Sequence, residues 1–176
     1  MQGRLKDLPP LSLPLHLDGC VSAFEYDCPI GHAIRNLKYS RKTYLADILG
    51  DLLPFDETIP AEWIIPVPLH PKRLSKRGFN QSELLAEALS RRTGIPVLND
   101  LLERKIHTDP QAGLSGKERR NNLKGAFSCK KSLPAETVIL VDDVITTGST
   151  LSACAEALKK SGIQKVYACT VASAVE

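Results

Sequence analysis

The sequence predicts a single α/β domain, residues 1–176, with a mostly parallel central sheet flanked by helices. Two segments carry this prediction, because each passes from a short apolar strand candidate through a polar loop into an amphipathic helix. The strand candidates are residues 63–68 and residues 138–141. A repeated order of strand, loop and helix is typical of parallel sheets, in which the connecting helices cover the two faces.

Length and composition fit one globular domain, since the chain has 176 residues and an apolar content of 43%. Residues 1–15 are rich in proline and are expected to form an extended lead-in. No apolar run approaches the length of a membrane span, and the first residues lack the apolar core of a signal peptide. Five cysteines without a C-x-x-C pair favour a reducing compartment, so we expect a cytoplasmic protein.

The first strand candidate is followed by a basic segment that is expected to be a loop. The helix after this segment is predicted to begin at the cap residue Asn80, with Glu83 three positions on, and to end near Gly94. A solvated basic turn is one interpretation of such a segment, and an anion site is the other. Its cations, with the glycine that follows them, are Lys72, Arg73, Lys76, Arg77 and Gly78.

Residues 104–122 are polar and lack apolar periodicity, so they are predicted to form a mobile lid. A short helix within it is expected to be capped by Ser115 and Glu118. The cations of such a lid can stabilise an anionic leaving group or contact a nucleic-acid backbone. The polar side chains expected to act there are Arg104, Lys105, Gln111 and Arg119.

Two carboxylates, Asp142 and Asp143, stand where the strand candidate 138–141 ends. Ligands of open α/β sheets bind beyond the carboxyl ends of the strands, so acids at this place indicate chemistry rather than packing. The loop after them opens a helix, and its backbone N–H groups and hydroxyls can converge on one phosphate. A glycine there permits close approach of the backbone. The predicted phosphate loop is Thr146, Thr147, Gly148, Ser149 and Thr150.

The segment VILVDDVITTGST, residues 138–150, resembles the phosphoribosyl pyrophosphate (PRPP) motif of type I phosphoribosyltransferases. The resemblance implies that Asp142 and Asp143 are the catalytic acids and hold the ribose 2′ and 3′ hydroxyls, directly or through Mg²⁺. It also implies that the 146–150 loop holds the 5′-phosphate. The alternatives are an Asp-rich turn before a capped helix and the acidic strand of a P-loop NTPase. No G-x-x-x-x-G-K-[ST] motif occurs, which excludes the NTPase.

Three segments in order are similar to those of the ComF (competence protein F) family of phosphoribosyltransferase-like proteins. They are PVPLHPKRLSKRGFNQSELLA, RKIHTDPQAGLSGKERRNNLKGAF and VILVDDVITTGST, and the segment RNLKYS, residues 35–40, also resembles a family segment. The resemblance implies the type I phosphoribosyltransferase fold with a small N-terminal hood at residues 15–30. It further implies that pyrophosphate is bound by Lys72, Arg73, Arg77, Arg104 and Lys105, among which Arg77 is the leading candidate of the first basic segment.

Zinc is not expected, although ComF proteins commonly begin with a zinc module that bears C-x-x-C pairs. This sequence has no such pair, and an alternative ligand set remains in His16, Cys20, Cys28 and His32.

The function implied by the resemblance is Mg²⁺-dependent transfer of phosphoribosyl from PRPP to an unidentified acceptor base or amine, with release of pyrophosphate. Purine salvage enzymes of this fold usually carry an aspartate where this chain has Thr146, so a 6-oxopurine acceptor is disfavoured. Two alternatives stay open: a noncatalytic PRPP sensor, and an accessory protein of DNA uptake that contacts single-stranded DNA or a helicase. A net charge of +3 and basic segments poor in aromatic residues do not favour DNA by themselves.

Overall fold

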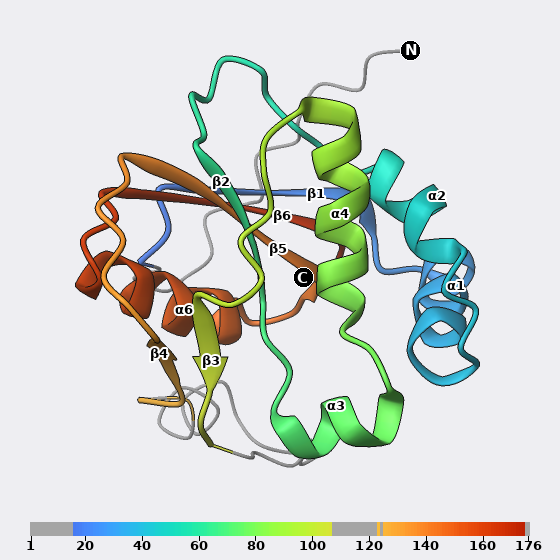
Figure 1. The fold of residues 1–176 in the computed structure, drawn as a ribbon. Coiled ribbons are helices and arrows are strands. Elements are labelled where there is room, and N and C mark those ends of the chain that lie inside the picture. Colours follow the sequence, from blue (N-terminus) through green and yellow to red (C-terminus); the bar gives the residue numbers. More distant parts are fainter. Residues whose placement is uncertain (1–15, 107–122, 124, 175–176) are drawn as a thin grey trace.

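A parallel sheet of four strands lies at the centre of the molecule, in the order β1-β6-β5-β2 (Figure 1). The structure is a computed structural model that describes residues 16–106, 123 and 125–174. The strands are β1 (Gly19–Glu25), β6 (Lys165–Ser173), β5 (Thr137–Ile145) and β2 (Trp63–Pro66). All three pairings are parallel, so the predicted α/β class and the parallel sheet are confirmed.

Strand β5 is buried on both faces because its side chains alternate between two hydrophobic clusters. Val138 and Leu140 belong to one cluster, whereas Ile139 and Val141 belong to the other, as the period of two in a strand requires. The strand runs to Ile145, beyond the predicted end at residue 141. The two acids therefore lie within the last part of β5 and not in the loop after it.

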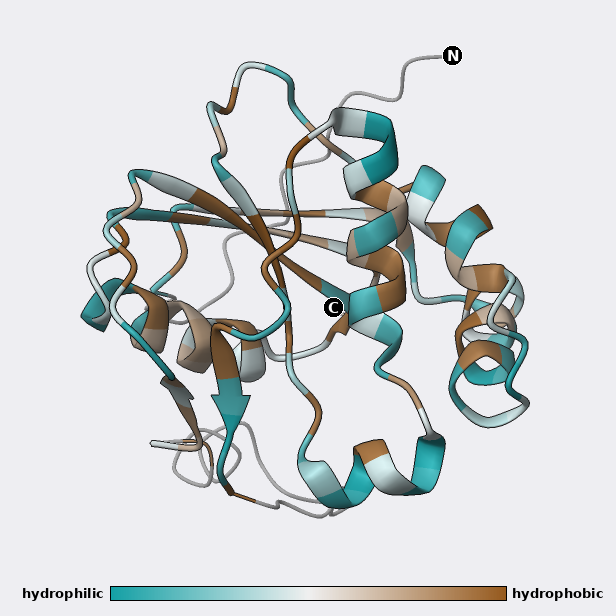
Figure 2. Cartoon of the chain, viewed as in Figure 1, coloured by the Kyte–Doolittle hydropathy of each residue, from teal (hydrophilic) through white to brown (hydrophobic). Residues whose placement is uncertain are grey.

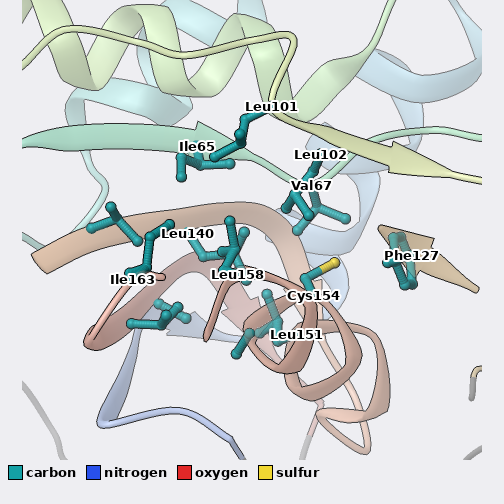
Figure 3. Packing of buried hydrophobic residues seen from close by; sticks show 14 of the residues in the cluster. Ile65, Val67, Leu101, Leu102, Phe127, Leu140, Leu151, Cys154, Leu158 and Ile163 are labelled. Carbon is teal, nitrogen blue, oxygen red and sulfur yellow. The ribbon is translucent and has the colours of Figure 1, made fainter. Parts of the chain in front are cut away.

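Helix α6 (Ser149–Lys160) covers one face of the sheet, and its apolar residues Leu151, Cys154, Ala155 and Leu158 are buried. Figure 3 shows the hydrophobic cluster between this helix and the sheet, which is the one that contains Val138 and Leu140. Leu140 lies on the sheet, and Leu151, Cys154 and Leu158 lie on the helix. The other cluster joins the sheet to α1 (Cys28–Tyr39), α2 (Leu45–Asp51) and α4 (Gln81–Thr93). The central strands between these layers are largely apolar (Figure 2).

Helix α4 begins and ends where its sequence signals predict. The Asn80 side chain accepts a hydrogen bond from the Ser82 N–H group, and its amide donates to Glu83 at 3.3 Å. Gly94 closes the helix with a φ of 75°, in the left-handed region that glycine adopts without strain. The N-terminal cap at Asn80 places residues 81 and 82 beside the end of β5.

The first basic segment is a short helix, α3 (Pro71–Arg77), and the expectation of a loop was wrong. The His70 Nδ1 atom accepts a hydrogen bond from the Lys72 N–H group at 3.2 Å, which caps the helix. Pro71 suits the first helical position because its φ is already helical, and Gly78 ends the helix with a φ of 88°. The cations of this segment therefore lie on a helix, and because neighbouring side chains of a helix project from different sides, they point in different directions.

Two further ranges differ from the expectations. Residues 19–25, within the expected hood, form the edge strand β1, whose register with β6 pairs Gly19 with Tyr167. At the base of the expected lid, β3 (Leu102–Arg104) pairs with β4 (Phe127–Cys129) in an antiparallel ribbon. Residues 107–122 of the expected lid, which include Gln111, Ser115, Glu118 and Arg119, lie outside the described residues, as does the lead-in 1–15. None of the helices in the described ranges has both the length and the apolar composition of a membrane span.

Candidate functional site

A cavity of about 470 Å³ lies beside the carboxyl end of β5. Its walls come from segments that are far apart in the sequence: the end of α1, the turn after β2, the helices α3 and α4, and the ribbon strand β3. The sequence-predicted residues that line it are Asp142, Asp143, Thr146, Thr150, Arg73, Arg77 and Arg104. The structure thus brings one carboxylate pair, part of the predicted phosphate loop and three arginines to a single cavity.

Asp142 accepts two hydrogen bonds on one carboxylate oxygen. The Ser82 hydroxyl donates to Oδ1 at 2.9 Å, and the Asp143 N–H group donates to the same atom at 2.9 Å. Burial, followed by the charge of Asp143, raises the pKa of Asp142 to about 7. This acid therefore changes its charge near neutral pH.

Asp143 is more deeply buried, with only 6% of its side chain exposed. The Gln81 amide donates to its Oδ1 atom at 3.2 Å, and the ammonium group of Lys38 forms an ion pair with Oδ2. Oδ2 has no hydrogen-bond partner among the described residues, so the Lys38 charge is what compensates its burial there. Burial acts to lower the pKa of Lys38, but the charges of both acids and the contact with Asp143 outweigh it and raise the pKa.

Sequence reasoning missed Lys38, Gln81 and Ser82. Lys38 lies in RNLKYS, which was noted only for its likeness to a family segment, and nothing local pairs it with an acid more than a hundred positions away. The position of Gln81 and Ser82 could have been predicted from the sequence. They directly follow the helix cap Asn80, and a helix that comes after a buried strand begins near the edge of the sheet where ligands bind. They are 4% and 1% exposed, which is unusual for polar side chains.

The phosphate loop lies between β5 and α6. Gly148 has a φ of 73° and precedes the first residue of α6, and the Ser149 N–H group at that N-terminus donates a long hydrogen bond of 3.5 Å to the Thr147 hydroxyl. The hydroxyls of Thr147 and Ser149 are 2.8 Å apart, and Thr146 and Thr150 face the cavity. A helix N-terminus of this kind, with hydroxyls around it, suits a phosphate group.

Three arginines line the cavity, and each lies near another polar or aromatic group. The Arg77 guanidinium donates to the Gln81 side-chain oxygen and lies 5.4 Å from the centre of the Tyr39 ring. Burial, followed by the charge of Arg73, lowers the pKa of Arg104, whose guanidinium lies over Phe127. Arg73 and Arg104 are thus two positive groups that lie near each other, and Arg104 is partly removed from water. Such a pair attracts an anion of high charge.

Other predicted site residues lie elsewhere. Lys72 is exposed on α3, and Lys105 is exposed and forms an ion pair with Glu103 at 3.3 Å. Neither lines the cavity. Within the described residues, no three histidine, cysteine or acidic side chains come together as a metal site, so the alternative set with Cys20 and Cys28 is not assembled.

The chain matches a protein-family model and is also similar in sequence to individual proteins. The family model described as "Phosphoribosyl transferase domain" matches residues 80–175. "Competence protein F" of Haemophilus influenzae is 51% identical over 108 residues, which cover 60% of this chain and 47% of that protein. "DNA utilization protein YhgH" of Escherichia coli O157:H7 is 36% identical over 155 residues, covering 83% of this chain and 68% of that protein. The chain thus spans about half of one relative and two thirds of the other.

Solved structures with a similar chain path include two phosphoribosyltransferases. Orotate phosphoribosyltransferase from Aeropyrum pernix has a TM-score of 0.44 and 16% identity, with 80% of this chain and 76% of that chain covered. Purine phosphoribosyltransferase from Pyrococcus horikoshii has a TM-score of 0.40 and 17% identity, with 87% and 92% covered.

Proposed function

The chain belongs to the phosphoribosyltransferase family, with competence protein F among its relatives, and we propose that its cavity beside β5 binds PRPP. The assignment from the three sequence motifs is thereby confirmed, and so is the type I phosphoribosyltransferase fold.

One observation carries the proposal: a single cavity joins groups that suit each part of PRPP. Asp142 and Asp143 provide acceptors for the two ribose hydroxyls, and the Gly148 turn at the N-terminus of α6 suits the 5′-phosphate. Arg73, Arg77 and Arg104 supply positive charge for the pyrophosphate. The ligand chemistry that fits is a phosphorylated sugar with a second, more highly charged group.

Mg²⁺ fits this site as an ion that is shared with the ligand. Mg²⁺ in proteins is typically bound through one or two carboxylates, with phosphate oxygens of the substrate and waters completing its octahedron. Both oxygens of Asp143 already contact Gln81 and Lys38, so Asp142 is the carboxylate best placed to hold it. When bound, Mg²⁺ would neutralise charge on the leaving pyrophosphate.

The reaction that we propose is transfer of the phosphoribosyl group to an acceptor base or amine. The bond from ribose C1 to pyrophosphate breaks with oxocarbenium character, and the bond to the acceptor nitrogen forms. In this scheme the two acids orient the ribose and are not nucleophiles, while the arginines stabilise the charge of pyrophosphate. The side chains of this chain therefore act by positioning and by electrostatics.

A second candidate is a PRPP-responsive accessory role in DNA utilisation, without catalysis. The names of the relatives favour it, and so does α3, on which Lys72 and Lys76 are exposed and do not line the cavity. Exposed lysines of this kind are suited to a nucleic-acid backbone.

The experiment follows PRPP consumption by ³¹P NMR with Mg²⁺ and a panel of acceptors that includes orotate, adenine and simple amines. Pyrophosphate release that needs both an acceptor and the acid pair would support the enzyme. The matched control is an Asp142→Asn, Asp143→Asn double variant with a native circular-dichroism spectrum. Binding of PRPP without consumption would favour the sensor, and salt-dependent binding of single-stranded DNA that weakens in Lys72→Ala would favour the accessory role.

A further inference from the structure

Lys38 is the one lysine that lines the described cavity, and its ammonium group contacts an acid. It lies in the last turn of α1, and its ammonium group contacts Asp143 Oδ2 on β5. Only 21% of the Lys38 side chain is exposed. A lysine held in this way costs side-chain entropy and desolvation, which the buried charge of Asp143 offsets.

The contacts of the two acids are unequal. Asp143 is enclosed, with Gln81 on one oxygen and Lys38 on the other. Asp142 accepts from Ser82 and from a backbone N–H group, and no ion pair reaches it within the described ranges. The acids therefore differ in what they can offer a cation: Asp143 already has a positive partner, and Asp142 has neutral donors.

We propose that Lys38 is a positioning residue that takes the place of a metal ion on Asp143 and keeps divalent cations off the acid pair until the ligand brings them. This inference rests on the proposed function of the site as one for PRPP and Mg²⁺. Lys38 holds the Asp143 carboxylate in place, and the ammonium charge reduces the attraction of the pair for a free divalent ion. The acid pair would then hold Mg²⁺ only when the oxygens of PRPP help to bind it.

The electrostatic reason is the local charge. When both acids are ionised, the two neighbouring carboxylates carry two negative charges and would attract a divalent ion strongly, whereas the same pair with a buried ammonium carries one. An opposite charge at contact distance typically changes the proton affinity of a carboxylate by about ten- to a thousandfold. A divalent ion on the same carboxylate is subject to the same field, so loss of Lys38 should strengthen metal binding by at least about tenfold.

The test measures binding of Mn²⁺ alone, followed by the electron paramagnetic resonance signal of the free ion in protein freed of metal. Wild-type protein is expected to bind Mn²⁺ weakly, and Lys38→Met at least about tenfold more tightly. Lys38→Arg retains the charge and should restore weak binding. The double variant Lys38→Met, Asp143→Asn should lose the gain, because the ion would bind at Asp143. Lys160→Met, which removes an exposed ion pair with Glu156, should match wild type.

Equal Mn²⁺ affinity in wild type and Lys38→Met would overturn the inference, as would a gain that persists without Asp143. Tight binding of Mn²⁺ to the wild-type protein alone would also overturn it, and this arm requires no variant to fold. If Lys38→Met is unfolded, Lys38→Gln replaces it under the same expectation. A merely structural ion pair would change stability but not Mn²⁺ affinity. A separate titration of wild type with PRPP tests the proposed function, so the failure of one claim is distinguishable from the failure of the other.

Discussion

Replacing Asp142 with asparagine should stabilise the folded protein at pH 8 when metal is removed with EDTA. Burial and the neighbouring acid raise the pKa of Asp142 from 3.8 to about 7. The folded state therefore binds a proton that the unfolded state releases, and stability falls as the pH rises from about 4 to about 7. A shift of about three pKa units corresponds to a penalty on the order of 4 kcal/mol above pH 7. Asparagine keeps an oxygen that accepts from Ser82 and removes the charge.

Urea unfolding at pH 5, 6, 7 and 8 measures this effect. Wild type should lose stability from pH 5 to about pH 7, with a slope of up to about 1.4 kcal/mol per pH unit from this acid, and the curve should level off by pH 8. Asp142→Asn should show a flatter curve between pH 5 and pH 7. The exposed Asp100, 93% exposed on its side chain, supplies the control variant Asp100→Asn, whose curve should run parallel to wild type. Parallel curves for wild type and Asp142→Asn would refute the argument, because they would mean that Asp142 is not held in a state that resists ionisation.

Three other predictions concern the phosphate loop, the arginines and the thiols. Gly148→Ala and Gly94→Ala both force alanine into the left-handed region, so each should lower the free energy of unfolding in urea by about 1–2 kcal/mol. Only Gly148→Ala should also weaken PRPP binding measured by calorimetry. Unchanged PRPP affinity in Gly148→Ala would mean that the loop is not part of the site. Arg77→Ala should weaken PRPP binding by roughly ten- to a hundredfold, since a hydrogen bond to a charged group contributes about 1.5–3 kcal/mol. The control is Lys76→Ala, because Lys76 is exposed on the same helix and does not line the cavity, and its PRPP affinity should remain within about twofold of wild type. A thiol reagent at pH 8 should label the exposed Cys28 first, because burial raises the pKa of Cys20 and Cys169 to about 12; fast labelling of Cys169 in the folded protein would contradict the burial.

The sequence predicted the parallel sheet and the ends of α4, because those features have local causes. A β-branched apolar run next to turn residues suits a buried strand, and the cap at Asn80 and the glycine at Gly94 act within a few residues of themselves. Asp142 and Asp143 were predicted as site residues because a carboxylate pair at the end of a buried strand has few structural uses, and the structure places both of them in the cavity.

The parts that the sequence did not predict depend on contacts between distant segments. Lys38 reaches Asp143 only because α1, the helix after β1, packs in the same hydrophobic cluster as β5 and β6. The segment of β1 itself was expected to be part of a hood. The orientation of the cations on α3 was also hidden, since a run of lysines and arginines does not show which side chains face inward. His70 and Pro71 could have predicted that helix, because a capping side chain before a proline is a helix start.

The central claim is that the cavity beside β5 binds PRPP through Asp142 and Asp143. Calorimetric titration of PRPP into the protein, with and without Mg²⁺, tests it most directly when the folded Asp142→Asn, Asp143→Asn double variant is run in parallel. The account predicts binding that strengthens with Mg²⁺ and is lost in the double variant. Absence of binding to folded wild-type protein, or equal binding by the double variant, would contradict it.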